Sequence, residues 1–181
     1  MNLKKFQTWA EQEHSSQKRL LLVIPALIGF CLVLPFLFVT ASTAMDRYFQ
    51  WPSFKWGNFN IVIGVICVVI GGWLGLWTVR IQFILGKGTP APFMPTRTLI
   101  ILGPYKFCRN PMIFGVFLAY LGLGIWTATA SGAIMALLFL WVASVYIKEV
   151  EEKELEIRFG ADYMNYKKTT PFLLPAFKKR T

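Results

Sequence analysis

The stretch Leu102-Gly-Pro-Tyr-Lys-Phe-Cys-Arg-Asn-Pro-Met-Ile-Phe-Gly115 is polar, basic and rich in turn-forming residues, and it lies between long apolar runs. Gly103-Pro104 and Asn110-Pro111 each predict a turn. Asn110 is a favoured N-cap residue, and Pro111 suits the first turn of a helix because its missing N–H would be unpaired there. The stretch therefore predicts a helix that begins directly after a basic turn.

Two cations, Lys106 and Arg109, lie beside the predicted start of this helix. The free N–H groups at a helix N-terminus favour anionic ligands, so the two residues can help to hold a carboxylate or a phosphate. Basic residues at the end of a membrane helix also anchor it among lipid headgroups, which requires no ligand. Charge alone favours the anchor, and the rest of the chain has to decide between the two interpretations.

The composition is that of an integral membrane protein. Hydrophobic residues make up 55% of the 181 residues and the mean hydropathy is +0.51, yet the formal net charge is +10. The charges lie between and after apolar runs that are long enough to cross a bilayer. We interpret 1–181 as one all-α membrane domain with four transmembrane helices at about 20–42, 59–79, 112–127 and 132–147, followed by an interfacial helix and tail at 148–181.

The basic residues also predict how these spans are oriented. Most of them lie in the N-terminal segment, in the loop 80–110, which has no acidic residue, and in the C-terminal tail. Under the positive-inside rule both termini and this loop face the cytoplasm, and we expect a bacterial inner membrane. No basic stripe has the polar, aromatic context of nucleic-acid binding, so we expect no nucleic-acid partner.

Local features give expectations about packing and about metals. Gly71 and Gly75 form a small-xxx-small pair that predicts a close helix contact, and Pro25 or Pro35 is expected to bend the first span. Asp46 is placed in a loop at 43–58. With one histidine and three cysteines without paired spacing, we predict neither a metal site nor a Ser-His-Asp triad.

The acidic residues after the fourth predicted span are expected to lie on a continuing helix. Spacing predicts the exposed pairs Glu149 with Lys153 and Glu154 with Arg158, and Gly160 is expected to end the helix. This leaves Glu151 and Glu152 close to the membrane surface without partners. We predict that one of them faces a cation of the basic loop, Arg97, Lys106 or Arg109, in a mixed-charge pocket.

The order of the motifs resembles a known family. Gly88-Thr-Pro-Ala-Pro-Phe93 is followed by Gly-Pro-Tyr-x-x-x-Arg-Asn-Pro-Met at 103–112, by an apolar hairpin, by Glu-Glu-x-x-Leu-x-x-x-Phe-Gly-x-x-Tyr-x-x-Tyr at 151–166, and by Leu174-Pro175. This arrangement, over about 86–175, resembles the isoprenylcysteine carboxyl methyltransferases and the related phospholipid methyltransferases.

The resemblance implies an integral-membrane methyltransferase that uses S-adenosylmethionine and acts on a lipid-like or amphipathic small-molecule acceptor. It implies a cytoplasmic cofactor pocket between the loop 80–110 and the C-terminal helix. Arg109 and Glu152 are the implied catalytic residues. The implied cofactor-binding residues are Arg97, Thr98, Leu99, Ile100, Tyr105, Asn110, Pro111, Met112, Ile113 and Glu151.

The chemistry of these side chains suits the cofactor. Arg109 and the helix N-terminus can hold its carboxylate, and Glu151 can pair with its ammonium, which needs a partner once it leaves water. Tyr105 and Phe107 offer aromatic faces to the adenine or the sulfonium. Methyl transfer depends mainly on positioning and requires no nucleophile from the protein.

Three positions depart from the pattern of the family. Asn110 stands where its best-known members have histidine, Ile113 where tyrosine is frequent, and Ile147 where eukaryotic prenylcysteine enzymes have arginine. We therefore do not predict prenylcysteine as the acceptor.

Two other functions remain as alternatives. A membrane reductase of the steroid-reductase type can show a similar Arg-(His/Asn)-Pro turn and would use NADPH. A four-helix scaffold or permease would need no cofactor, but a permease should carry ionisable residues at mid-membrane, and no charge lies within a predicted span.

Overall fold

The computed structural model describes residues 24–25, 27–86, 96 and 98–174, and every structural statement below concerns these residues. Their elements are η1 (Gly29–Val33), α3 (Leu34–Tyr48), α4 (Asn58–Ile84), η2 (Gly103–Lys106), α5 (Pro111–Trp126), α6 (Ala130–Tyr146), η3 (Ile147–Glu151) and α7 (Glu152–Thr169). This described part contains helices and no strand, which confirms the predicted all-α class.

The first described helix runs further than the sequence predicted. The π-helical turn η1 ends two residues before Pro35, which cannot donate an N–H to the helix, so the backbone departs from α geometry close to this proline. The helix α3 then continues to Tyr48, so the prediction that Asp46 lies in a loop at 43–58 is wrong. The carboxylate is tolerated in the helix because it binds the N-terminus of α6.

The helix α4 also extends beyond its predicted end. The prediction stopped at residue 79 because Arg80 is charged, but α4 continues to Ile84. Arg80 is exposed, and its long apolar stem lets the charged group reach out of the apolar layer without ending the helix. The predicted loop 80–110 therefore begins about five residues later than expected.

Glycines bring α4 and α5 together along their lengths. A Cβ on Gly64 would lie 2.7 Å from the carbonyl oxygen of Gly122, and one on Gly71 would collide with the backbone of Gly115. Gly75, predicted as the partner of Gly71 in this contact, also faces α5, because a Cβ on Gly115 would lie 3.1 Å from its backbone nitrogen, although a Cβ on Gly75 itself would meet open space. Spacings of four and of seven residues both return to nearly the same helix face, so Gly64, Gly71 and Gly75 all lie along the contact with α5.

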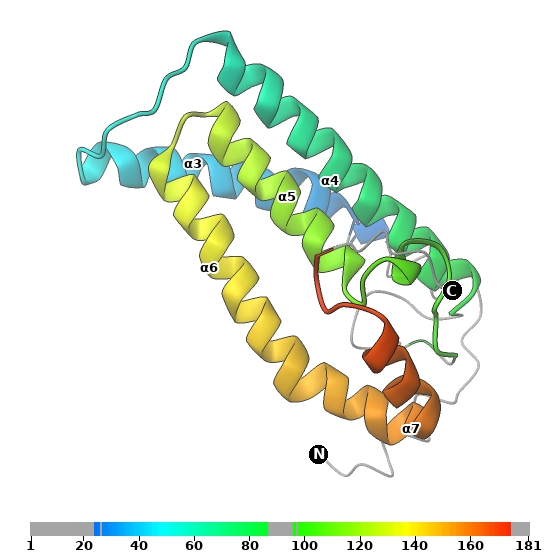
Figure 1. Cartoon of the computed structure of the whole chain (residues 1–181). Helices are drawn as coiled ribbons and strands as arrows, with labels where there is room; N and C mark the ends of the chain where they lie inside the picture. The colour runs from blue at the N-terminus through cyan, green and yellow to red at the C-terminus, as the bar shows by residue number, and fades with distance from the viewer. Residues whose placement is uncertain (1–23, 26, 87–95, 97, 175–181) are drawn as a thin grey trace.

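The helices α5 and α6 form the tight antiparallel hairpin that the sequence predicted. The link between them is Thr127 to Thr129, in which Ala128 has a φ of 54°. A Cβ on Gly124 would lie 2.9 Å from the backbone of Gly132, so these glycines let the helices approach each other at the hairpin end. The start of α5 and the end of α6 consequently lie together at the other end of the bundle (Figure 1).

The chain passes from α6 through η3 into α7 without leaving helical geometry, except at Gly160. This residue has φ 51° and ψ −124°, a non-helical conformation at which the first helical half of α7 ends, as predicted, and from which the second half runs back in the opposite direction. The second half of α7 returns toward the first turn of α5, as Figure 1 shows. The C-terminal part of the described chain therefore covers the start of α5.

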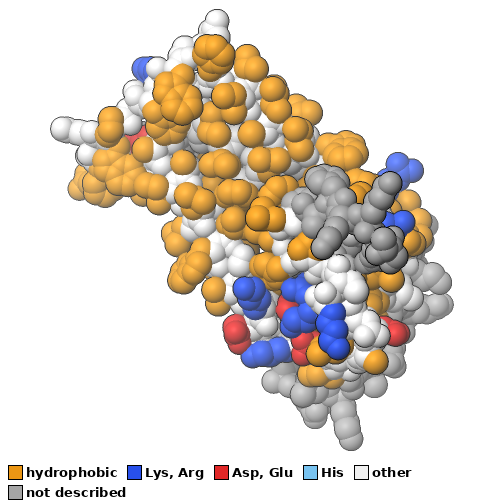
Figure 2. Space-filling view, viewed as in Figure 1, with side chains coloured by type: hydrophobic (Ala, Val, Ile, Leu, Met, Phe, Trp, Pro, Cys, Tyr) orange, Lys and Arg blue, Asp and Glu red, His pale blue; other side chains and the backbone are white. Residues whose placement is uncertain are grey.

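Three helical stretches among the described residues are long and apolar enough to cross a membrane, Gly29–Tyr48, Asn58–Ile84 and Ala130–Thr169. The third predicted span, α5, has 16 residues and a length of ~24 Å, short of the ~30 Å of a bilayer core. Figure 2 shows hydrophobic side chains over most of the visible helical surface, with charged side chains gathered at the α7 end. Lys148 and the residues after it lie beyond the apolar part of α6.

Candidate functional site

The basic turn that opens α5 adopts the predicted local structure. Gly103 has a φ of 59°, a left-handed conformation that glycine adopts without strain, and it begins the short helix η2. Asn110 is the N-cap residue of α5 and Pro111 occupies its first turn, as predicted. The side chain of Asn110 does not cap the helix, because its Nδ2 donates a hydrogen bond to the carbonyl oxygen of Phe172 at 2.9 Å.

Arg109 forms a buried ion pair with Glu152. Nη2 of Arg109 lies 2.9 Å from Oε1 of Glu152, although the two atoms are not aligned as a hydrogen bond. The side chains are only 10% and 5% exposed, respectively. This confirms the prediction that a glutamate after α6 faces a cation of the basic turn, and the glutamate is the second of the two candidates.

A second cation reaches the same carboxylate from the returning half of α7. Nζ of Lys167 lies 2.8 Å from Oε2 of Glu152 and 2.8 Å from Oε1 of Glu156. The carbonyl oxygen of Lys167 accepts a hydrogen bond from Nη1 of Arg109 at 2.9 Å. We refer to Arg109, Glu152, Glu156 and Lys167 as the charge network, and its formal charges sum to zero.

The segment after α7 is fastened over the basic turn. The backbone N–H of Arg109 donates to the carbonyl oxygen of Pro171 at 2.9 Å, beside the bond from Asn110 to Phe172. The ring of Phe172 lies 4.8 Å from Nζ of Lys148 and 5.8 Å from the guanidinium carbon of Arg109. A site at the start of α5 is therefore partly closed by the C-terminal segment.

Tyrosines form the wall next to the charge network. The hydroxyl of Tyr166 donates to the carbonyl oxygen of Tyr105 at 2.8 Å, and Nε2 of Gln82 donates to the hydroxyl of Tyr105 at 2.6 Å. Burial raises the pKa of Tyr105, Tyr163 and Tyr166 and raises the pKa of the Cys108 thiol to about 11. These groups stay protonated at neutral pH. They can therefore line the site and donate hydrogen bonds, but they do not act as a general base.

Glu151 lies one residue before the network, in η3. The side chain of Glu151 is exposed to solvent, and no ion pair among the described residues involves it. Crowding by protein atoms, and then the carboxylates of Glu154 and Glu152, raise the pKa of Glu151. Among the described residues Glu151 is thus a carboxylate without a cation, beside one that has two.

The other predicted cofactor residues surround the same end of the bundle. Leu99 lines a cavity of about 380 Å³ with Ile101, Asp162, Asn165, Tyr166 and Thr169. Thr98 is exposed and donates to the carbonyl oxygen of Leu85 at 3.2 Å, while Ile100 is buried. Met112 and Ile113 are half-buried in the first turn of α5. Arg97, the tail from 175 onward and the proline-rich segment 87–95 lie outside the described residues.

Sequence reasoning missed Gln82 and Lys167, whereas the apolar segment from Pro171 was expected either to dip back to the membrane interface or to cover the pocket, and Phe172 does lie over Arg109. Gln82 was placed in a loop because of the early predicted end of α4. Lys167 and Phe172 contact the site only because α7 reverses at Gly160. The glycine predicted that a helix ends there, but it did not predict the direction in which the chain continues. The predicted pairs Glu149 with Lys153 and Glu154 with Arg158 are confirmed, at 2.7 Å and 3.1 Å.

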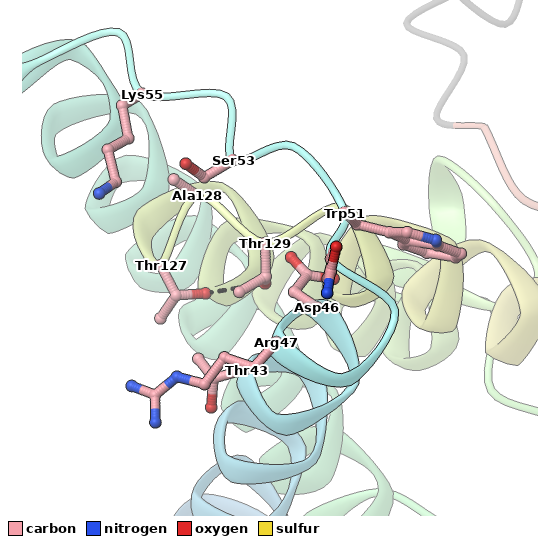
Figure 3. Close-up of a pocket in the computed structure, with 10 residues that line it drawn as sticks. Thr43, Asp46, Arg47, Trp51, Ser53, Lys55, Thr127, Ala128 and Thr129 are labelled. Atoms are coloured by element: carbon pink, nitrogen blue, oxygen red, sulfur yellow. Dashed lines mark hydrogen bonds between the residues drawn. The ribbon is translucent and has the colours of Figure 1, made fainter.

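The opposite end of the bundle has a cavity of about 460 Å³ beside Asp46 (Figure 3). The carboxylate of Asp46 accepts hydrogen bonds from the backbone N–H groups of Ala130 and Ser131 at 2.8 Å and 2.9 Å, and from the hydroxyl of Ser131. It therefore caps α6 from another helix and ties α3 to the hairpin. None of the predicted site residues lines this cavity.

Comparisons with known proteins match residues 59–162, more than half of the chain, to the phospholipid methyltransferase family. Methanethiol S-methyltransferase 2 of Bradyrhizobium diazoefficiens is 32% identical over 149 residues, which covers 71% of this chain and 53% of that protein. Protein-S-isoprenylcysteine O-methyltransferase of Mus musculus is 27% identical over 133 residues, with 71% and 46% covered. The chain thus spans about half the length of the curated relatives it matches.

Proposed function

Because the chain belongs to the phospholipid methyltransferase family, we propose that it transfers a methyl group from S-adenosylmethionine to an amphipathic acceptor in the membrane. The observation that carries this proposal is the buried pair of Arg109 and Glu152 at the start of α5, inside the region that the family matches. An amino-acid zwitterion carries a carboxylate and an ammonium, and an arginine beside glutamates complements both.

Arg109 and the first N–H groups of α5 would hold the carboxylate of the donor. The first N–H groups of a helix have no partner within it, and Asn110 does not cap them. Nε of Arg109 is buried without a hydrogen-bond partner among the described residues. Both features support an anionic ligand at this point, since buried polar groups are normally bonded.

Glu151 would take the ammonium of the donor, because Glu152 already has two cations. The adenosine would lie in the cavity that Leu99 and Tyr166 line, where apolar side chains and the hydroxyl and amide groups of Thr169 and Asn165 suit a neutral nucleoside. The carboxylate of Asp162, which also lines this cavity, would repel the phosphates of NADPH, which S-adenosylmethionine lacks. This cavity therefore favours the methyl donor over the nicotinamide cofactor.

The donor supplies an electrophilic methyl group on a sulfonium. A nucleophile of the acceptor forms a bond to the methyl carbon, and the electron pair of the breaking carbon–sulfur bond stays on sulfur. The protein contributes by fixing the line of attack, which is the main source of rate in such a displacement. The related proteins are named for S-methylation and for O-methylation, so their names leave the accepting atom open.

Transfer of radioactive methyl from S-adenosylmethionine tests the proposal. Purified protein in lipid nanodiscs would be offered phosphatidylethanolamine, a farnesylated cysteine and a short alkyl thiol in parallel. We expect one acceptor class to be labelled, and Ile147, which is buried and apolar, favours an acceptor without a carboxylate at that position. Binding of NADPH without binding of S-adenosylhomocysteine would instead establish the reductase alternative.

We also propose that the charge network faces the cytoplasm of a bacterial inner membrane, with both termini on that side. The support is the excess of basic over acidic residues in 80–110. Single cysteines at Lys106 and Gln50, both exposed and at opposite ends of the bundle, test the orientation in a cysteine-free background. An impermeant thiol reagent added to intact spheroplasts should label position 50 and spare position 106, and labelling of both would contradict the orientation.

A further inference from the structure

Lys167 contacts both members of the buried ion pair. Its ammonium is bonded to Oε2 of Glu152 and its carbonyl oxygen to Nη1 of Arg109. It lies outside the region that matches the family and outside every set of residues predicted from the sequence. Glu156 holds the ammonium from the other side at 2.8 Å.

We propose that Lys167 is a positioning residue for the methyl donor, because it fixes the orientation of both Arg109 and Glu152. This inference rests on the function proposed above. One carboxylate oxygen of Glu152 faces Arg109 and the other faces Lys167, so a single cation does not have to satisfy both. Arg109 can therefore keep Nε turned away from Glu152, available to the donor's carboxylate.

The reversal at Gly160 makes this arrangement possible. In a straight helix the fifteen residues from Glu152 to Lys167 would span ~22 Å, far beyond the reach of a lysine side chain. The φ of 51° at Gly160 folds the two halves of α7 together, and side chains other than glycine are strained there. The positioning contact thus depends on one backbone conformation.

The charge balance explains why removal of Lys167 should affect donor binding. Glu152 is faced by Arg109 from the basic turn and by Lys167, Glu156 and Tyr163 from α7, with Glu151 in η3 directly before it. Without Lys167, Glu152 is left with Arg109 alone and must draw the guanidinium toward both of its oxygens. The bonds to Glu152 and Glu156 raise the pKa of Lys167, so the lysine is charged throughout the usual assay range.

The test measures the affinity of S-adenosylhomocysteine by calorimetry on the full chain in nanodiscs. We expect Lys167→Met to weaken binding about tenfold, with a matching rise in the KM for the donor and little change in the KM for the acceptor. Lys167→Arg should restore affinity to within about threefold, because guanidinium can also bridge two carboxylates. Lys168→Met, at the exposed neighbouring position, should bind like the wild type.

Wild-type affinity in Lys167→Met, or an equal loss in Lys168→Met, would overturn the inference. If Lys167→Met does not fold, Glu156→Gln provides the second variant, since it loosens the ammonium and should weaken binding about twofold to threefold. Unchanged affinity in that variant would then overturn the inference. A wild type that does not bind S-adenosylhomocysteine would contradict the proposed function itself, a result distinct from failure of the Lys167 variants.

Discussion

The two ends of the helix bundle each hold a carboxylate between helices, and they use it differently. Asp46 accepts its hydrogen bonds from two backbone N–H groups and a hydroxyl at the start of α6. Glu152 faces two side-chain cations, Arg109 and Lys167, from two different parts of the chain. Asp46 is therefore held by neutral donors, whereas Glu152 is held by full charges.

The difference shows what distinguishes a candidate site from a structural contact. At the Asp46 end the carboxylate has three hydrogen-bond donors among the described residues, and these contacts hold α3 against the start of α6. At the Arg109 end bonding capacity remains, in Nε of Arg109, the first N–H groups of α5 and the carboxylate of Glu151. Unused capacity, and not buried charge alone, indicates a ligand.

Replacing Arg109 by alanine should have the largest effect on donor binding. It removes a charge-assisted contact worth ~1.5–3 kcal/mol, which corresponds to about a 10- to 150-fold loss of affinity for S-adenosylhomocysteine in calorimetry. It also leaves Glu152 with one cation, so some loss of thermal stability is expected. Arg80→Ala, at an exposed position of α4, is the control. Unchanged affinity in folded Arg109→Ala would mean that Arg109 is an anchor only.

Replacing Asp46 by alanine should lower the stability of the protein without changing donor binding. The variant removes the cap of α6, which costs ~1–2 kcal/mol of the free energy of unfolding, and should leave donor affinity unchanged. Unfolding in a denaturing detergent measures the first quantity and calorimetry the second. Weaker donor binding in a folded Asp46→Ala protein would remove the distinction between the two ends.

Replacing Glu151 by glutamine should weaken donor binding about threefold to tenfold and alter its pH dependence. Because the pKa of Glu151 is raised, the ammonium should lose its partner as pH falls through the mildly acidic range, and wild-type affinity should fall with it. The variant should show a flatter profile. In the empty protein the raised pKa makes ionisation costly as pH rises, so Glu151→Gln should not be less stable at neutral pH.

Replacing Glu154 by glutamine should have the smallest effect. Glu154 pairs with Arg158 four residues later on the same helix, a contact worth ~0.3–0.5 kcal/mol. Arg158 also donates to the carbonyl oxygen of Thr96, so its position does not depend on Glu154 alone. Donor affinity should stay within about twofold of the wild type. A loss as large as that of Glu151→Gln would show that the acidic face acts as a whole and that Glu151 has no particular role.

The parts of the structure that depend on nearby residues could be predicted from the sequence. Asn110 and Pro111 start α5 where their backbone preferences require, and the pairs of Glu149 and Glu154 follow from helical spacing. Contacts between distant residues could not be predicted. The helix α3 includes Asp46 only because residues 130 and 131, more than 80 positions later, supply its partners.

The choice between Glu151 and Glu152 shows a second reason why parts of the site could not be predicted from the sequence. The turn η3 is a π-helix, which has more residues per turn than an α-helix and so changes the face on which later side chains lie. Ordinary helical spacing therefore could not decide which glutamate faces Arg109. Lys167 was out of reach for a similar reason, because the direction of the chain after Gly160 is set by packing against the basic turn.

Hydrogen exchange with and without S-adenosylhomocysteine tests the comparison between the two ends most directly. We predict slower exchange at the turn 103–113 and at 147–172, with no change at 43–57 and 127–132. Slower exchange at the Asp46 end, or no change anywhere at saturating ligand, would contradict the claim that the Arg109 end is the donor site.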